Sequence, residues 1–249
     1  MRTIQLIIFT LLALTGCTKK NGLTNSGNTV YTKDSTTLKI VNNDTIRYLA
    51  LGDSYTIGQS VPLAESFPYQ LTDTLSKLGF KTANPLIIAT TGWTSADLIT
   101  GIEQYNQNTP LSNNYDFVTL LIGVNDQYQG LSQTAYQKNF VQLLQQAIAY
   151  AKGDKTRVFV LSIPDYGVTP FANGQDAVIG PEIDQFNAIN LEESRMAGVN
   201  YLDITGISRE AANSPNLIAP DGLHPSGLMY AQWVVALLPM VISRINKTN

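Results

Sequence analysis

From about residue 45 onward, short apolar segments rich in β-forming residues alternate with longer segments of helical periodicity in this 249-residue chain. The apolar segments, which we predict to be strands, are residues 46–51, 86–90, 117–122, 158–163 and 199–204. They are nearly continuous apolar runs and do not alternate with polar residues, which is typical of parallel strands covered on both faces. The sequence therefore predicts a mainly parallel sheet between two layers of helices.

The segments between the predicted strands have the spacing of amphipathic helices. We predict helices over residues 67–78, 95–105, 133–152, 181–197 and 226–245. Gly153 and Gly198 follow two of these helices directly, as is typical of helix ends. Residues 45–249 are enough for one α/β domain with a full core. The predicted fold is a three-layer α/β/α sandwich with a central five-stranded sheet.

Polar motifs follow three of the predicted strands directly. Residues 52–55 (Gly-Asp-Ser-Tyr) come after the first strand, residues 91–93 (Thr-Gly-Trp) after the second and residues 123–126 (Gly-Val-Asn-Asp) after the third. Ligands of parallel α/β sheets bind at the carboxyl ends of the strands. The three motifs therefore predict a site at one edge of the sheet.

His224 is the only histidine of the chain, and it lies three residues after Asp221, near the C-terminus. Together with Ser54 in the first motif, these residues supply the parts of a serine hydrolase: a nucleophile, a base and a carboxylate that orients the base. Taken singly, each residue also has a structural explanation. Ser54 can end a strand, and Asp221 can precede a helix beside a half-exposed histidine.

Taken together, the motifs follow the order Gly-Asp-Ser, Gly, Gly-x-Asn-Asp and Asp-x-x-His. This order resembles that of the SGNH (GDSL-type) hydrolase family over about residues 45–245, and it implies a flavodoxin-like fold. The matching residues are Ser54, Gly92, Asn125 and His224. Two positions depart from the family pattern. Tyr55 replaces the usual leucine, and the asparagine that often precedes the family glycine is missing, so Gly92 is the least secure match.

The resemblance implies a role for each residue. Ser54 is the nucleophile, His224 accepts its proton, and Asp221 orients the imidazole. The oxyanion hole consists of the backbone N–H groups of Ser54 and Gly92 and the side-chain amide of Asn125. We expect neither a metal nor another cofactor, because one histidine and no cysteine in the domain leave few ligands.

The first 17 residues are typical of an export signal. Arg2 precedes an apolar stretch over residues 4–14 that is too short to span a bilayer. Residues 14–17 (Leu-Thr-Gly-Cys) resemble the lipobox of bacterial lipoproteins, so we predict lipidation of Cys17, a flexible tether over residues 18–44 and a membrane-anchored location in the bacterial cell envelope. The alternative is an ordinary secretory signal with an incidental thiol. We expect no later segment long enough to span a membrane.

The predicted function is that of a serine esterase which forms an acyl-enzyme, acting on a short-chain ester or on the O-acetyl ester of a carbohydrate. A lysophospholipase or thioesterase, a glycan-binding lipoprotein without activity and a purely structural anchor remain as alternatives. The net charge of −3 and the lack of a basic cluster argue against nucleic acid as a partner. Candidate specificity residues near the predicted strand ends are Tyr55, Trp93, Tyr128, Tyr166 and Phe171.

Overall fold

The computed structural model describes residues 44–245. Cys17, the predicted signal peptide and nearly all of the predicted tether lie outside this range, and their assignments stay predictions. The described residues form a sheet in the order β2-β1-β3-β4-β5, with every neighbouring pair parallel. The strands are β1 (Tyr48–Gly52), β2 (Leu86–Ala89), β3 (Phe117–Leu121), β4 (Val158–Leu161) and β5 (Asn200–Leu202). This is the flavodoxin-like strand order.

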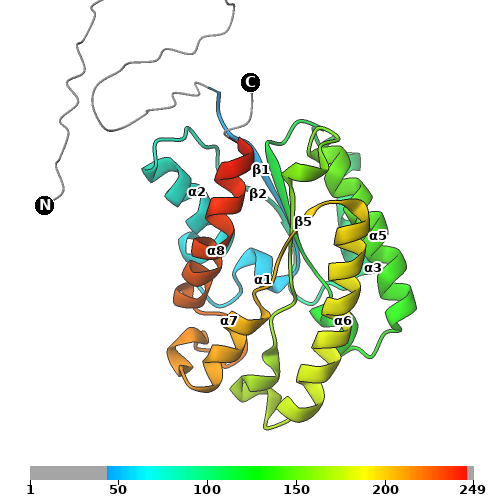
Figure 1. Cartoon of the computed structure of the whole chain (residues 1–249), viewed down its shortest axis with the longest axis vertical. Helices are drawn as coiled ribbons and strands as arrows, with labels where there is room; N and C mark the ends of the chain where they lie inside the picture. Colours follow the sequence, from blue (N-terminus) through cyan, green and yellow to red (C-terminus); the bar gives the residue numbers. More distant parts are fainter. Residues whose placement is uncertain (1–43, 246–249) are drawn as a thin grey trace, which may run out of the picture. The chain divides into compact units, whose positions relative to one another are not determined.

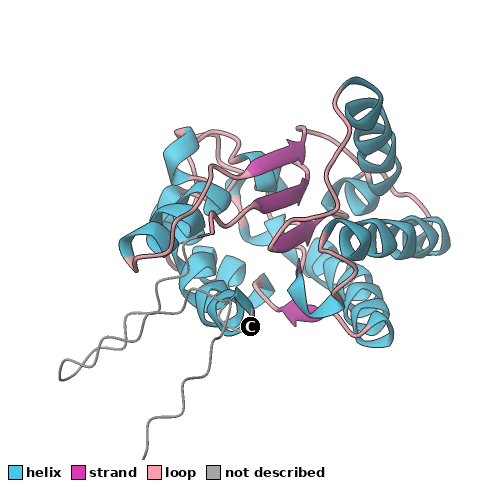
Figure 2. Cartoon of the chain, turned by 90° about the horizontal axis from the view of Figure 1, so that it is seen from above, coloured by secondary structure: helices cyan, strands magenta, loops and turns pink. Residues whose placement is uncertain are grey.

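Helices cover both faces of the sheet. One face carries α2 (Phe67–Lys77) and α8 (Gly227–Ile245), and the other carries α3 (Ser95–Asn108), α5 (Gln133–Tyr150) and α6 (Asp176–Ala197) (Figures 1 and 2). Three short helices lie in the loops: α1 (Ser54–Ile57), α4 (Val124–Tyr128) and α7 (Thr205–Arg209). The predicted three-layer α/β/α sandwich is therefore confirmed.

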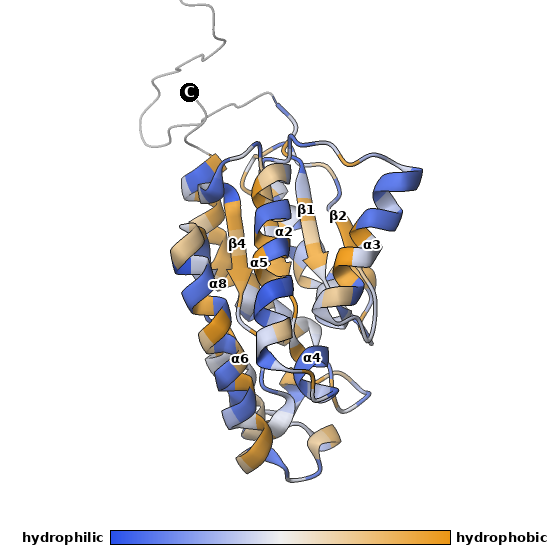
Figure 3. Cartoon of the chain, turned by 90° about the vertical axis from the view of Figure 1, so that its right-hand side faces the viewer, coloured by the Kyte–Doolittle hydropathy of each residue, from blue (hydrophilic) through white to orange (hydrophobic). Residues whose placement is uncertain are grey.

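The three central strands form the core of the sheet. Every residue of β1, β3 and β4 is buried, and β4 is hydrophobic along its length (Figure 3). The edge strands β2 and β5 are mostly half-buried. The continuous apolar runs in the sequence therefore reflect burial on both faces, as expected for parallel strands.

Most predicted boundaries differ from the structure by one to three residues, and the start of α6 differs by more. Helix α6 begins at Asp176, whereas the prediction placed its start at Pro181. Instead, the N–H groups of Val178 and Ile179 bind the carbonyl of Gln175, and the helix continues through the proline. The first strand was predicted from Ile46, which makes only an isolated bridge.

Helix α8 contradicts the expectation that no later segment could span a membrane, since it is long and apolar enough to do so by length and composition. Its buried side chains include Tyr230, Trp233 and Leu237. The Trp233 ring lies 6.0 Å from that of Phe67 in α2. The apolar character of α8 thus serves packing against the core of this domain.

Candidate active site

The nucleophile candidate Ser54 is placed by an abrupt change from strand to helix. A side chain at Gly52, the last residue of β1, would lie 2.1 Å from Thr56 Oγ1 and 2.4 Å from the Leu121 carbonyl oxygen, so only glycine fits. Asp53 then caps α1, because its Oδ1 accepts the Tyr55 N–H at 3.0 Å. Ser54 is the first residue of α1, where backbone N–H groups lack an acceptor within the helix.

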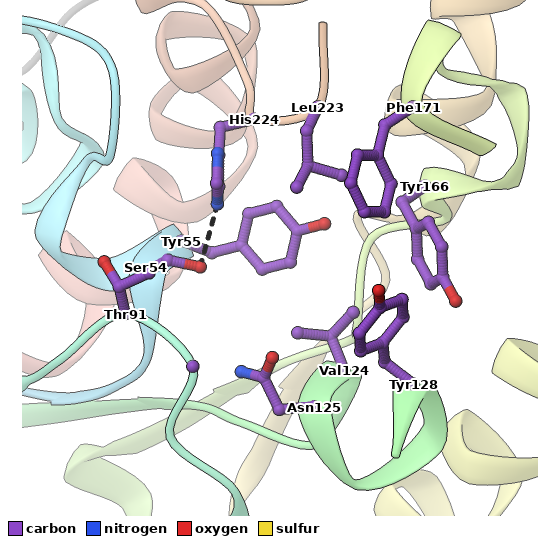
Figure 4. Close-up of a pocket in the computed structure, with 11 residues that line it drawn as sticks. Ser54, Tyr55, Thr91, Val124, Asn125, Tyr128, Tyr166, Phe171, Leu223 and His224 are labelled. Atoms are coloured by element: carbon purple, nitrogen blue, oxygen red, sulfur yellow. Dashed lines mark hydrogen bonds between the residues drawn. The ribbon is translucent and has the colours of Figure 1, made fainter. Parts of the chain in front are cut away.

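The structure brings Ser54 together with the two residues near the C-terminus. Ser54 Oγ lies 3.0 Å from His224 Nε2 (Figure 4). On the other side of the ring, His224 Nδ1 lies 2.6 Å from Asp221 Oδ2. Both Ser54 and His224 are largely buried and line one cavity. Hydrogen bonds from Ala219 N–H to the His224 carbonyl and from Gly222 N–H to the Ala219 carbonyl shape the loop that presents the imidazole. This arrangement can pass the serine proton to the imidazole.

The Asp221 carboxylate accepts four hydrogen bonds. Its Oδ1 accepts the N–H groups of Leu223 and His224, both at 3.0 Å, and its Oδ2 accepts the imidazole and the Ser60 hydroxyl. Partial burial alone would raise the pKa of Asp221, but the hydrogen bonds from Ser60, the imidazole and the backbone hold that pKa well below its usual range. Asp221 is therefore ionised at all pH values near neutrality.

Two further residues that we predicted as hydrogen-bond donors of the oxyanion hole line the same cavity. Gly92, on the loop after β2, has a φ of +83°, which favours glycine. Asn125 lies in α4 and donates from Nδ2 to the Trp93 carbonyl at 2.9 Å, so its amide holds the Gly92 loop. The amide group has a second N–H, which this bond does not use. The structure thus gathers Ser54, Gly92 and Asn125 around one cavity, including the residue that was the least secure match.

Two buried carboxyl groups support this edge of the sheet. Asp126 accepts the backbone N–H and hydroxyl of Ser95 at 2.8 and 2.6 Å and so ties α4 to α3. Burial raises the pKa of Asp126. Burial, with the neighbouring charge of Asp126, raises the pKa of Asp53 to about 8. These contacts indicate a structural role for both Asp53 and Asp126.

The cavity has a volume of about 140 Å³. Its apolar wall consists of Tyr55, Val124, Tyr128, Tyr166, Phe171 and Leu223. The rings of Tyr128, Tyr166 and Phe171 have centroids 6.0–6.3 Å apart and form an aromatic cluster at one side (Figure 4). Trp93, the remaining candidate for specificity, packs on Gly101 and does not line the cavity.

Sequence reasoning missed Ser60 and Gln59, and it gave no individual role to Thr91 of the Thr-Gly-Trp motif. Ser60 bonds Asp221, and Thr91 lines the cavity and donates to Gln59 Oε1 at 2.7 Å. No motif marks Ser60 or Gln59, and Ser60 has a left-handed backbone conformation that a serine rarely adopts. Within residues 44–245, no three His, Cys, Asp or Glu side chains form a group that could hold a metal ion.

The fold resembles that of several solved ester hydrolases. A lipase/acylhydrolase from Enterococcus faecalis aligns with 80% of this chain and 97% of its own, at 16% identity and a TM-score of 0.63. An acetylxylan esterase from Geobacillus stearothermophilus aligns with 79% of this chain and 94% of its own, at 18% identity and a TM-score of 0.58. A psychrotrophic esterase from Pseudoalteromonas aligns with 81% of this chain and 97% of its own, at 17% identity and a TM-score of 0.57.

No curated protein matches the sequence. The model of the GDSL-like lipase/acylhydrolase family matches residues 50–232, which include Ser54, Gly92, Asn125, Asp221 and His224. The chain therefore belongs to the GDSL-like lipase/acylhydrolase family and is a hydrolase that acts on ester bonds.

Proposed function

We propose that the protein is a serine esterase that hydrolyses short-chain esters, O-acetyl groups of carbohydrates among them, through an acyl-enzyme. The observation that carries the proposal is the line of contacts from Ser54 Oγ to His224 Nε2 at 3.0 Å and from His224 Nδ1 to Asp221 Oδ2 at 2.6 Å. It supplies a nucleophile, a base and an orienting carboxylate in one cavity.

In the first half of the reaction, His224 accepts the proton of Ser54 while Oγ attacks the ester carbonyl. The ionised Asp221 stabilises the imidazolium that forms. The N–H groups of Ser54 and Gly92 and the amide of Asn125 donate to the oxyanion of the tetrahedral intermediate. The imidazolium then protonates the leaving alcohol, and Ser54 retains the acyl group.

In the second half, water attacks the acyl-enzyme carbonyl as His224 accepts its proton. The same donors stabilise the second oxyanion. The imidazolium returns the proton to Ser54 Oγ as the bond to the acyl group breaks, which releases the carboxylic acid and restores the enzyme.

The size of the cavity supports a short acyl group. Its volume of about 140 Å³ is close to that of an engineered cavity of about 150 Å³ that binds benzene. An acetyl or butyryl group fits such a space, whereas a long acyl chain extends beyond it.

The aromatic cluster supports a carbohydrate as the alcohol part. Tyr128 and Phe171 are 60% and 48% exposed, so part of each ring can contact a ligand. Leu223 and Phe171 lie on the side of His224, which protonates the leaving alcohol (Figure 4). One solved structure with the same fold is an acetylxylan esterase.

The test is a series of p-nitrophenyl esters of increasing acyl length together with acetylated xylan, assayed with the wild-type enzyme and Ser54→Ala. We expect acetate and butyrate to be the best p-nitrophenyl substrates and Ser54→Ala to be inactive but folded. A rate unchanged in Ser54→Ala contradicts the proposed mechanism, and a preference for long chains contradicts the proposed substrate. Labelling of Ser54 by a fluorophosphonate distinguishes an esterase from an inactive glycan-binding or structural protein.

We further propose that Cys17 carries a lipid that anchors the enzyme in the bacterial cell envelope, with residues 18–44 as its tether. The order of Arg2, a short apolar stretch and the Leu-Thr-Gly-Cys segment supports this. Membrane fractionation of cells that express the wild-type chain or Cys17→Ala tests it. We expect the wild-type protein in the membrane fraction and no acylated N-terminal peptide from Cys17→Ala.

A further inference from the structure

The Asp221 carboxylate receives a hydrogen bond from a part of the chain that no motif marks. Ser60 Oγ donates to Asp221 Oδ2 at 2.5 Å, and the two residues are 161 positions apart in the sequence. Oδ2 is also the oxygen that faces His224 Nδ1, at 2.6 Å. The Ser60 hydroxyl therefore binds the atom on which the orientation of the imidazole depends.

The other two hydrogen bonds to this carboxylate come from its own loop. The N–H groups of Leu223 and His224 hold Oδ1, so they move together with Asp221 if the loop moves. A carboxylate has about four acceptor positions, and these four donors fill them. Of the four, Ser60 alone comes from the segment that carries the nucleophile.

The turn that carries Ser60 is fixed to the nucleophile itself. The N–H groups of Gly58 and Gln59 donate to the Ser54 carbonyl at 3.2 and 3.0 Å. Ser60 then has a φ of +68°, a conformation that costs a serine energy and persists where its surroundings impose it. The chain thus connects Ser54 to the Asp221 carboxylate by a second route that does not pass through His224.

We propose that Ser60 is a positioning residue of this esterase, whose hydroxyl holds the Asp221 carboxylate in register with His224 and takes up part of its negative charge. The inference rests on the proposed function of Ser54, Asp221 and His224. The Ser60 hydroxyl then has two effects on the reaction. It keeps the imidazole aligned, and it weakens the attraction of Asp221 for the imidazolium.

Ser60→Gly tests both claims with little risk to folding, because glycine adopts a positive φ more readily than serine does. We expect kcat for p-nitrophenyl acetate to fall about tenfold through lost alignment, with KM little changed. The acidic limb of the pH profile of kcat/KM should move to higher pH, by about half a unit. The reason is that the Asp221 carboxylate stabilises the imidazolium more strongly without the hydrogen bond from Ser60. The melting temperature should stay equal or rise.

Ser60→Thr is the control with the opposite change to Ser60→Gly. It keeps the hydroxyl but places a β-branched residue at a positive φ, so we expect a lower melting temperature and an unshifted acidic limb. Gln59→Met is the matched control in the same turn, since it removes the bond from Thr91 and leaves Asp221 untouched. We expect this variant to keep the wild-type position of the acidic limb.

The outcomes separate this inference from the proposed function. If Ser54→Ala abolishes hydrolysis while Ser60→Gly keeps kcat within twofold and the acidic limb in place, the role of Ser60 is refuted and the esterase stands. If Ser60→Gly and Gln59→Met lower activity equally without a shift of the limb, the turn is only structural. If Ser54→Ala retains full activity, the proposed function itself fails.

Discussion

Asn125 is the residue whose loss should affect the transition state most selectively. Its amide donates without titrating and lies on the cavity wall in α4. We expect Asn125→Ala to lower kcat by about 10²–10³, the usual effect of one lost oxyanion donor, with KM nearly constant. Steady-state kinetics with p-nitrophenyl acetate measure this. Because Asn125 also binds the Trp93 carbonyl, a melting curve is the control, and a large rise in KM without a change in kcat would contradict the assignment.

Asp53 gives a pH prediction about stability. Burial, assisted by the charge of Asp126, raises the pKa of Asp53 in the folded state from 3.8 to about 8, so the folded protein binds this proton more tightly than the unfolded chain. The contribution of this proton to the stability of the folded protein is fully present below pH 3.8, and it is lost as the pH rises to about 8. Asp53→Asn, which is neutral at every pH, should remove this dependence.

The measurement is the free energy of unfolding by denaturant at pH 5 and at pH 8, for the wild-type protein and Asp53→Asn. We expect the variant to gain stability relative to the wild type between these two values. Asp73→Asn, an exposed carboxyl in α2, serves as the control and should show no such gain. If the free energies of unfolding of the wild type and Asp53→Asn differ by the same amount at both pH values, the prediction is wrong.

The residues of the site were predictable where the sequence offers few choices. A single histidine three positions after an aspartate, and a serine directly after a strand, leave one combination of nucleophile, base and acid. The structure places these side chains together. Ser60 was not predictable, because its contact with Asp221 depends on a backbone conformation that its sequence neighbours do not specify.

The segment after β4 is the element that forms one wall of the cavity. Its two short 3₁₀ turns, Tyr166–Val168 and Pro170–Ala172, carry two of the three clustered rings. Arg209 holds the segment by a 2.9 Å ion pair with the buried Asp165, and Phe171 N–H donates to the Gly222 carbonyl at 3.0 Å. The wall is therefore tied directly to the loop that carries His224.

Truncating the exposed rings should affect KM for a large substrate more than KM for a small one. We expect Phe171→Ala and Tyr128→Ala to raise KM severalfold for acetylated xylan and to change KM for p-nitrophenyl acetate much less, because the small ester does not reach across the aromatic cluster. Val235→Ala, at a position of α8 that is 73% exposed, is the control for loss of an apolar surface residue. Equal changes with both substrates would show that the rings only support the fold.

At the level of elements, the sequence predicted the type and order of the strands and long helices, because their periodicity extends over many residues. It did not predict α1 or α4, which are four and five residues long and too short for any periodic pattern. Both short helices carry site residues, so the least predictable elements are those that position Ser54 and Asn125. Their presence follows from tertiary contacts such as the close approach at Gly52.

At the scale of the whole molecule, we expect the catalytic domain to act independently of the predicted anchor. All proposed site residues lie between Ser54 and His224, within the segment that matches the family. We expect a chain that begins at Asp44 to keep the wild-type kcat/KM for p-nitrophenyl acetate and to remain in the soluble fraction. Assays of the membrane and soluble fractions of cells that express either chain measure this, and a truncated chain that folds but loses activity would contradict the expectation.

The central claim is that Ser54 becomes acylated when His224, held by Asp221, accepts its proton. The most direct test mixes the enzyme with p-nitrophenyl acetate, quenches it with acid within the first turnover and maps the added mass by peptide mass spectrometry. We expect one acetyl group on the peptide that contains Ser54, and a strongly reduced yield in His224→Gln. Acetylation at another residue, or rapid turnover by Ser54→Ala without any acetylated peptide, would contradict it.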